Sequence, residues 1–244
     1  MKVVSVGSGM MGANVVHGAM SMSNLDSRPS DYYSLSRAEM MNYVPSDARR
    51  LIEFGCGYGN FSELATRERQ LECWGIEVEP EAAKCAAHKI HKVLCGDAAE
   101  LLQELPDSYF DCAVFNDILE HMADPYTLLL KVKAKLSPAG VVVASIPNVR
   151  YWRNLKRLVF RGEWTYTDKG ILDRSHLRFF TKKSIISMFD EAGYSIIRID
   201  GIKPTRSRSF RVANLIALGS LSDAKFCQFA CLARPLDSEK KSDG

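Results

Sequence analysis

Two glycine-rich loops in the first quarter of the chain could bind a nucleotide-like cofactor. The first is Gly-Ser-Gly-Met-Met-Gly at residues 7–12, which follows a short apolar run and formally matches a dinucleotide-binding fingerprint. The second follows the apolar run at residues 51–54 and contains Gly55, Gly57 and Gly59. Glycines at such spacing let the chain turn tightly and bring backbone N–H groups close to a ligand at the start of a helix. The residues after each loop must decide between the two.

The downstream context favours the second loop. A dinucleotide-binding unit needs a second strand that ends in an acidic residue about 20 residues after the loop. Residues 21–30, after the first loop, are polar and contain no apolar run that could form this strand. Residues 71–77, after the second loop, are strand-like and end in Glu77. We therefore interpret the second loop as the cofactor site and the first as part of an N-terminal extension.

The elements that must position this site alternate regularly. Between residues 50 and 146, short apolar runs and helix-like stretches follow one another four times, which is typical of parallel strands joined by crossover helices in an α/β fold. The runs show little polar alternation, as expected for strands covered on both faces. The expected strands are residues 51–54, 73–78, 92–95, 110–115, 140–146, 194–199 and 226–233. The expected helices are residues 61–69, 80–89, 98–105, 126–136, 181–192 and 210–219.

The overall composition is that of a globular protein. The chain has 244 residues, of which 46% are hydrophobic and 25% charged, and this excludes a disordered or fibrous chain. Its apolar runs are too short to span a bilayer, and the N-terminus makes a poor signal peptide. Seven scattered cysteines without a Cys-x-x-Cys pair favour reduced, buried thiols over disulfides or zinc. We therefore expect a cytoplasmic protein with no membrane span.

The regular pattern breaks after Pro147. Residues 148–180 are aromatic and basic, and we interpret them as a lid inserted into one domain at residues 41–234, between an extension at 1–40 and a polar tail at 235–244. From Val149 to Lys183 there are ten Lys or Arg and three acids, a local charge of +7 in a chain whose net charge is only +3. Such a field would attract an anionic ligand.

The motifs in their order resemble those of class I S-adenosylmethionine-dependent methyltransferases. The loop at residues 51–61, the acid at Glu77, the Gly-Asp pair at 96–97 and the stretch at 110–121 keep that family's order and spacing, and the likeness extends over roughly residues 45–235. The resemblance implies a Rossmann-like fold with a seven-stranded, mostly parallel sheet, helices on both faces and an antiparallel last strand. It also implies S-adenosylmethionine as the methyl donor.

The C-terminal half resembles a particular bacterial branch of these enzymes. Residues 146–152 (Ile-Pro-Asn-Val-Arg-Tyr-Trp) and residues 170–181, which include Asp-Arg-Ser-His-Leu-Arg-Phe-Phe-Thr, carry this likeness. Members of the branch commonly accompany glycosyltransferases of cell-surface polysaccharide synthesis. The resemblance therefore implies an acceptor connected with sugars.

The resemblance also assigns the residues that bind the cofactor. Glu53 would lie near the methionine ammonium, and Glu77 would accept both ribose hydroxyls, which a carboxylate can do in a bidentate way. Asp97 would accept from the adenine amine while the Ala98 N–H faces a ring nitrogen, and Asn116 would lie near the methionine end. Read without the family, Glu77 and Asp97 could be solvated acids at strand ends.

Two further groups complete the expected cofactor site. Gly55, Gly57 and Gly59 would let the backbone pass close beneath the cofactor. Tyr33 and Arg37 resemble a lead-in helix that covers the cofactor in relatives, although Tyr33 could equally be a packing residue.

Methyl transfer is an in-line displacement at the sulfonium methyl, so the protein chiefly supplies proximity and alignment. An acceptor hydroxyl would also need a base. Two histidines are candidates: His176, with Asp173 close enough in sequence to orient it, and His121, just after the fourth strand. Each histidine could instead be structural.

One trio near the fourth strand could hold a metal ion. Asp117, Glu120 and His121 have helical i, i+3, i+4 spacing and resemble a divalent-metal cluster of ubiquinone-biosynthesis O-methyltransferases. Asp117 stands where that family has Glu, which weakens the likeness. We predict no resident metal.

The acceptor would meet the insertion, where aromatic faces could stack on sugars or bases and arginines could clamp phosphate or carboxylate. These aromatics could equally pack onto the sheet beneath solvated charges. We expect Trp152, Arg174 and Arg178 to bind substrate. The aromatic residues of the insertion are Tyr151, Trp152, Phe160, Trp164, Tyr166, Phe179 and Phe180.

The sequence thus predicts O-methylation of a small or sugar-linked anionic acceptor. An RNA methyltransferase is a rival hypothesis, but there is no separate RNA-binding module, and Asn116 is followed by Asp-Ile-Leu rather than the Pro-Pro-Tyr of base N-methylation, so a nucleic-acid partner is disfavoured. A catalytically silent cofactor-binding protein is a further hypothesis, as is an NAD-dependent dehydrogenase built on the first loop.

Overall fold

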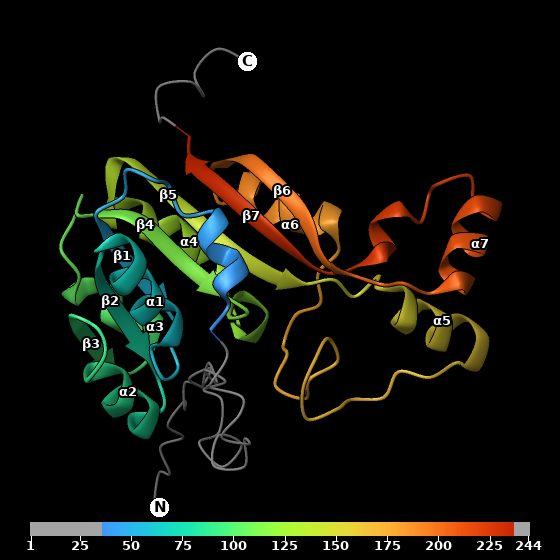
Figure 1. The fold of residues 1–244 in the computed structure, drawn as a ribbon, viewed down its shortest axis with the longest axis horizontal. Helices are drawn as coiled ribbons and strands as arrows, with labels where there is room; N and C mark the ends of the chain where they lie inside the picture. Colours follow the sequence, from blue (N-terminus) through green and yellow to red (C-terminus); the bar gives the residue numbers. More distant parts are fainter. Residues whose placement is uncertain (1–35, 237–244) are drawn as a thin grey trace, which may run out of the picture.

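A single twisted sheet forms the centre of the protein (Figure 1). The computed structural model describes residues 36–236, and within them the sheet has seven strands in the order β3-β2-β1-β4-β5-β7-β6. Neighbours among β1 to β5 pair in parallel, whereas β7 runs antiparallel to both β5 and β6. The strands are β1 Arg50–Phe54, β2 Glu72–Glu77, β3 Lys92–Cys95, β4 Phe110–Asn116, β5 Leu136–Pro147, β6 Tyr194–Pro204 and β7 Phe226–Pro235. The expected mostly parallel sheet with an antiparallel last strand is confirmed.

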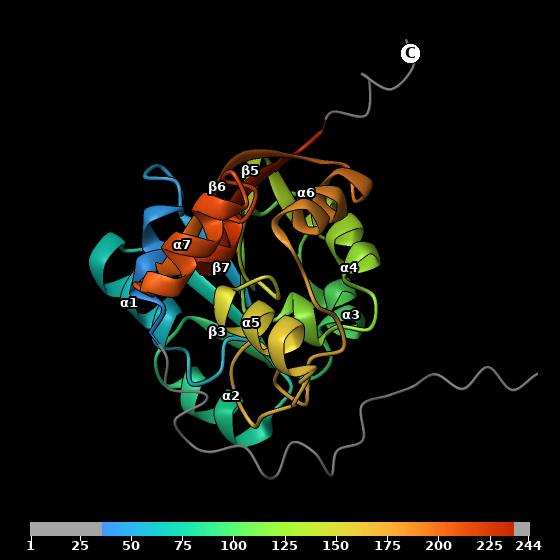
Figure 2. The same ribbon diagram turned by 90° about the vertical axis from the view of Figure 1, so that its right-hand side faces the viewer.

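Helices cover both faces of this sheet (Figure 2). They are α1 Asn60–Arg69, α2 Pro80–Ala87, α3 Ala98–Leu101, α4 Pro125–Val132, α5 Trp152–Arg161, α6 Lys182–Glu191 and α7 Arg208–Ile216. Side chains of α4 and α6 join the hydrophobic cluster on one face, and side chains of α1 and of the 3-10 helix Ala38–Asn42 join the cluster on the other. The helix starts follow simple chemistry: Pro is the first residue of α2 and α4, while the Thr181 side chain caps α6 in a capping box.

The central strands are apolar throughout because both of their faces are buried. In β1, Ile52 and Phe54 belong to one hydrophobic cluster and Leu51 to the other, as the alternation of side chains along a strand requires. The rings of Phe54 and Phe115 stack across β1 and β4 with centroids 4.6 Å apart. These contacts fix the register of the strands whose ends carry the candidate site.

The segment after β5 contains a helix that the sequence analysis did not assign. Its apolar residues recur at helical spacing, beginning with Trp152 and Leu155, but cations separate them and obscure the pattern. Helix α5 packs on α7, through Trp152 and Phe210, at the end of the molecule opposite β3 (Figures 1 and 2). No helix within residues 36–236 has the length and apolar character needed to cross a membrane.

Candidate active site

The predicted cofactor residues meet at the carboxyl edge of the parallel strands, where open α/β sheets bind their ligands. Glu53 lies near the end of β1, where it pairs in register with Gly75 of β2 and Val114 of β4. Glu77 ends β2, and Asn116 ends β4. The sheet topology therefore brings together residues that are up to 63 positions apart in sequence.

The loop after β1 requires glycine for both conformation and space. Gly55, Gly57 and Gly59 have φ values of 68°, 53° and 73°, in the left-handed region that L side chains rarely adopt. A β-carbon added to Gly55 would lie 2.6 Å from Cδ1 of Ile118, a distance that real β-carbons do not show. The loop is therefore held closely against the segment that follows β4.

Glu77 is fixed by the same loop. Its carboxylate is buried and accepts hydrogen bonds from the backbone N–H of Gly57 at 2.7 Å and of Glu79 at 3.0 Å, one on each oxygen. Each carboxylate oxygen can accept more than one hydrogen bond, so these two contacts do not by themselves exclude a diol. The geometry is thus compatible with the expected ribose contact, which stays a prediction.

Glu53 and Asn116 form a buried polar pair. Glu53 accepts from the Ser62 hydroxyl at 2.7 Å and from the Asn116 amide at 3.1 Å. Burial raises the pKa of Glu53 to about 7, and the hydrogen bonds from Ser62 and Asn116 oppose that rise. Within the described residues, the buried Oδ1 of Asn116 has no hydrogen-bond partner. A buried acceptor without a donor is costly, so this atom is suited to a donor on a ligand, such as an ammonium group.

Asp97 has a local structural role. Its Oδ1 accepts from the backbone N–H of Ala99 at 2.7 Å and of Glu100 at 3.3 Å, which makes it the N-cap of α3. The side chain is exposed, and Ala98 begins the helix beside it. Their expected contacts with adenine remain predictions.

Arg37 directly precedes the 3-10 helix Ala38–Asn42 and is tied to the sheet. It is buried, donates to Gln228 Oε1 at 3.0 Å and forms an ion pair with the Asp117 carboxylate. Gln228 in turn donates to Asp117 Oδ1 at 2.8 Å. The expected contact of Arg37 with the cofactor stays a prediction. Tyr33 and the glycine-rich stretch at residues 7–12 lie outside the described residues.

The two candidate histidines, expected as rivals, are neighbours. The rings of His121 and His176 meet edge to face with centroids 4.6 Å apart. Glu120 joins them, and one potential ligand atom from each of the three residues lies within 4.8 Å of the others. His176 Nε2 is 3.9 Å from Glu120 Oε1.

The histidine tautomers follow from their backbone partners. Nδ1 of His121 is 3.1 Å from the carbonyl oxygen of Ser175, and Nδ1 of His176 is 3.0 Å from that of Ile171. A carbonyl oxygen can only accept, so each Nδ1 carries the proton and each neutral ring has its basic lone pair on Nε2. For His176, the partner at Nδ1 is thus the Ile171 carbonyl and not the expected Asp173 carboxylate, whose Oδ1 accepts from the backbone and hydroxyl of Ser175.

Glu120 is the residue that the catalytic assignment missed. It is fully buried, and neither carboxylate oxygen has a hydrogen-bond partner among the described residues. Burial raises the pKa of its carboxyl group to about 8. The only sequence signal was its place beside His121, in a trio interpreted as a candidate metal cluster.

The expected Asp117 trio is not what the structure assembles. Asp117 has a φ of 53°, and its carboxylate is engaged by Arg37 and Gln228. Leu119–His121 forms a 3-10 helix instead of a turn of α-helix, so the i, i+3, i+4 spacing does not align the three side chains. The third member of the cluster is His176, from the distant insertion.

The three expected substrate residues have different surroundings, and their contacts with an acceptor stay predictions. Trp152 is buried between α5 and α7 and donates from Nε1 to the Ser209 hydroxyl at 3.0 Å, so its ring packs rather than faces an acceptor. Arg174 is exposed and pairs with Asp168 at 3.2 Å. Arg178 donates from Nε to the Ala123 carbonyl at 3.1 Å and so fastens the insertion to the loop after β4.

Other aromatic residues of the insertion lie closer to the histidines. Phe179 has its ring centroid 6.3 Å from that of His176, and it contacts Trp164 at 5.3 Å and Tyr166 at 6.2 Å. Trp164 and Tyr166 are both exposed. These rings are better placed than Trp152 to meet an acceptor.

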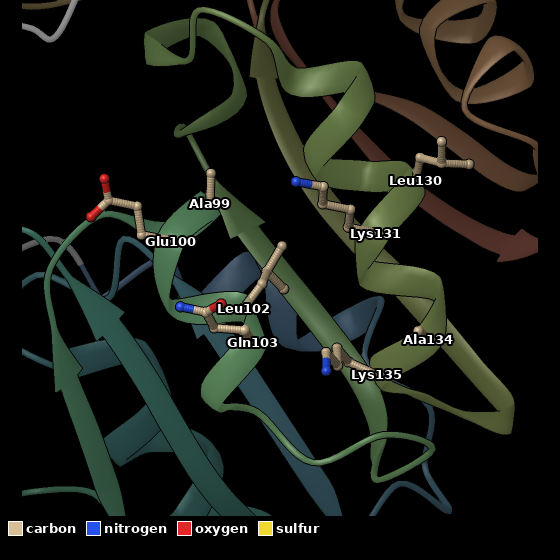
Figure 3. Close-up of a pocket in the computed structure, with 8 residues that line it drawn as sticks. All are labelled: Ala99, Glu100, Leu102, Gln103, Leu130, Lys131, Ala134 and Lys135. Carbon is tan, nitrogen blue, oxygen red and sulfur yellow. The ribbon is translucent and has the colours of Figure 1, made fainter.

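A separate hollow of about 680 Å³ lies between α3 and α4 (Figure 3). None of the expected site residues line it, and Lys135 at its edge pairs with Asp107 at 2.6 Å. We assign no chemistry to this hollow. Its lining is Ala99, Glu100, Leu102, Gln103, Leu130, Lys131, Ala134 and Lys135.

Comparison with known proteins identifies the family. A family model described as a methyltransferase domain matches residues 29–199, so the chain belongs to that family. Among solved structures, a SAM-dependent methyltransferase from Archaeoglobus fulgidus aligns with a TM-score of 0.60 and 20% identity, over 84% of this chain and 94% of that one. One from Mesorhizobium loti aligns with a TM-score of 0.56 and 19% identity, over 86% and 99%.

Curated relatives match a smaller share of the chain than these structures do. A ubiquinone biosynthesis O-methyltransferase from Cereibacter sphaeroides is 28% identical over 62% of this chain and 62% of its own length. A trans-aconitate 2-methyltransferase from Methylobacterium radiotolerans is 30% identical over 51% of this chain and 48% of its own length. The chain thus matches less than two thirds of the length of these relatives.

Proposed function

We propose that the protein transfers the methyl group of S-adenosylmethionine to an oxygen of a small or sugar-linked anionic acceptor. The observation that carries this proposal is the cluster that Glu120 and His121, shortly after β4, form with His176 of the insertion. Ile118, two residues before Glu120, packs on the glycine loop at Gly55, so the cluster is connected through this residue to the expected cofactor site. A base next to the sulfonium methyl is what transfer to a hydroxyl needs.

We assign the base to His121. It is half-buried, whereas His176 and Glu120 are buried, so His121 is the more accessible to an acceptor. Its Nε2 would take the acceptor proton as the acceptor oxygen attacks the methyl carbon and the sulfonium bond breaks. His176 would hold the ring of His121 by their edge-to-face contact. The Glu120 carboxyl group, once ionised, would stabilise the positive charge on the His121 imidazolium.

The anionic, sugar-linked character of the acceptor is supported by three observations. The insertion supplies the exposed Arg174, while Trp164 and Tyr166 expose aromatic faces of the kind that stack on sugar rings. The bacterial branch suggested by the Asp-Arg-Ser-His-Leu-Arg-Phe-Phe-Thr stretch is associated with polysaccharide synthesis. One relative is named for trans-aconitate, which is a small anion. We place the reaction in the cytoplasm because all seven cysteines are unpaired.

The test is a transfer assay with methyl-labelled S-adenosylmethionine and a panel of sugar nucleotides, lipid-linked sugars, hydroxy acids and phenolic acids. Label should appear in an O-methyl ether or ester of an anionic acceptor and should be lost in His121→Ala. Label on nitrogen or carbon, or an unaffected His121→Ala variant, would contradict the assignment. A protein that binds the cofactor but labels no acceptor in the panel would support a silent cofactor-binding role instead.

A metal-assisted version of the reaction is favoured by one observation. Glu120, His121 and His176 could hold a divalent cation, and the two unpartnered oxygens of Glu120 suit one. Such an ion would supply Lewis-acid activation of the acceptor oxygen. Loss of activity on chelation, restored by a divalent metal, would support this version, whereas activity independent of chelators would support proton transfer alone.

An RNA acceptor is the rival candidate, based on the basic and aromatic insertion. It predicts binding of RNA with a steep dependence on salt concentration and transfer of label to RNA.

A further inference from the structure

Helices α5 and α7 form an end of the molecule that stands apart from the sheet (Figures 1 and 2). We call residues 152–162 and 205–219 the α5–α7 end. Its two helices are held together by a small hydrophobic cluster around Trp152, Phe210 and Ala224. Only one face of each helix takes part in that cluster, which leaves the remaining faces to solvent.

Large apolar side chains crowd these remaining faces. Phe160 is 73% exposed, Ile216 is 78% exposed and Leu218 is 94% exposed. On α7, Val212, Leu215 and Ile216 have i, i+3, i+4 spacing and so share one face. Exposed apolar groups gathered on one part of a protein commonly mark a contact surface. The full set is Leu158, Val159, Phe160, Val212, Leu215, Ile216 and Leu218.

The same end carries a one-sided charge. Residues 152–162 and 205–219 contain seven arginines or lysines and no aspartate or glutamate. Within residues 36–236, the one ion pair formed by these seven cations is between Arg161 and Glu163, at the long distance of 3.9 Å. The seven cations are Arg153, Lys156, Arg157, Arg161, Arg206, Arg208 and Arg211.

The cations of α5 also surround a hollow. It has a volume of about 300 Å³ and is lined by Arg153, Lys156, Arg157, Arg161 and Phe160. A concave site lined by cations is suited to a phosphate group. Phe160 also lines this hollow, so an apolar ring lies next to the cations. A phospholipid has the same arrangement, with a charged headgroup next to an apolar acyl chain.

We propose that the α5–α7 end binds the surface of a bilayer that contains anionic lipid. Short amphipathic helices with exposed apolar residues and flanking Lys and Arg lie in such interfaces, where the cations contact headgroups and the apolar side chains enter the acyl boundary. No membrane-spanning helix is needed for this contact. The inference is independent of which acceptor the protein methylates.

Two other occupants fit the surface less well. RNA binding uses aromatic faces for base stacking, but of the seven exposed apolar side chains only Phe160 is aromatic. A second copy of the chain would bring seven cations against the same seven cations, a like-charge arrangement that opposes association. An anionic bilayer satisfies both the charge and the apolar surface.

The experiment is co-sedimentation of the full chain with vesicles of phosphatidylcholine alone and of phosphatidylcholine mixed equally with phosphatidylglycerol. We expect binding to the anionic vesicles at least tenfold stronger than to the neutral ones, weakening as salt is added. The variant Arg153→Gln/Arg157→Gln should lose about 25-fold in affinity, since each interfacial cation contributes about fivefold. The variant Phe160→Ser/Ile216→Ser should retain only weak, salt-sensitive binding.

Matched controls come from exposed residues elsewhere. Arg67 on α1 and Ile197 on β6 are exposed, so Arg67→Gln/Ile197→Ser should bind vesicles as the unaltered protein does. Equal binding to both vesicle types, or equal effects of the control and the α5–α7 variants, would overturn the proposal. So would a dimer in gel filtration that Phe160→Ser/Ile216→Ser dissociates, tighter binding to polyuridylate than to vesicles, or release from vesicles by inorganic phosphate at constant ionic strength.

Discussion

The cofactor side and the acceptor side of the site are built in different ways. On the cofactor side, the Glu77 carboxylate accepts hydrogen bonds from the backbone N–H groups of Gly57, in the glycine loop, and of Glu79, two residues further along. On the acceptor side, His121 and His176 are 55 positions apart, and backbone carbonyls of the insertion orient both. The first arrangement is imposed by local geometry and the second by how a distant segment folds back. The cofactor side should therefore be disrupted when a side chain is added where the backbone needs space. The acceptor side should be disrupted when a single histidine is replaced.

The largest effect should come from the acceptor side. His121→Ala should lower kcat by about 10²- to 10⁴-fold, the usual contribution of a general base, with cofactor affinity unchanged. The measurement is the transfer rate on an acceptor found in the panel, together with calorimetry of S-adenosylmethionine. His88→Ala, at an exposed histidine on the C-terminal end of α2, is the control. A loss of cofactor affinity equal to the loss of rate would show that the two sides are not separate.

On the cofactor side, Gly55→Ala should destabilise the protein by roughly 2–4 kcal/mol, since a positive φ and a clash with Ile118 act together. Gly162 also has a positive φ, of 64°, but has open space around its β-carbon position, so Gly162→Ala isolates the cost of conformation. Urea unfolding of both variants gives the difference. Equal losses of stability would mean that the close approach of the loop to Ile118 has no energetic weight.

Glu77→Gln tests the diol contact with a smaller effect. The amide keeps the shape but replaces one acceptor oxygen by a donor, so affinity for S-adenosylmethionine should fall by about 10- to 100-fold. Calorimetric titration measures this, and Glu81→Gln, at an exposed glutamate of α2, provides the control. An undiminished affinity in a folded variant would remove Glu77 from the cofactor site.

The smallest expected effect concerns how stability and cofactor affinity vary with pH, because both should follow the titration of Glu53. Its pKa of about 7 in the folded protein is raised above the ordinary 4.5, so the folded state favours the protonated form. The stability that this provides is fully present below about pH 4.5 and is lost as the pH rises through about 7. Binding of a ligand ammonium needs the ionised form, so affinity should rise with pH up to about 7, by at most about tenfold per unit. Glu53→Gln should flatten both profiles, and unchanged profiles would contradict the role of Glu53.

The sequence predicted most of the fold because its signals were local. The strand runs, the Thr181 cap and the left-handed glycines each depend on a few adjacent residues. The same holds for Glu77, which ends a strand beside the loop that it contacts.

What the sequence could not predict depends on contacts between distant segments. The Asp117 carboxylate pairs with Arg37, 80 positions upstream, and the residue that joins Glu120 and His121 is His176. Trp152 was expected at the acceptor, but it packs against Phe210 of α7 and donates a hydrogen bond to Ser209 of the same helix. Burial of this kind leaves no local pattern, since a buried tryptophan and a ligand-binding tryptophan have the same neighbours in sequence.

The link between Arg37 and Asp117 has a practical consequence for anyone who shortens the protein. Arg37 directly precedes the 3-10 helix Ala38–Asn42, so a shortened protein that begins at this helix would lack it. Asp117 would then keep Ser145 and Gln228 as donors but lose its cation, directly beside the strand end that carries Asn116. If the shortened protein folds but binds the cofactor weakly, the cause would be the loss of the ion pair between Arg37 and Asp117, and not an inability of the domain to bind the cofactor.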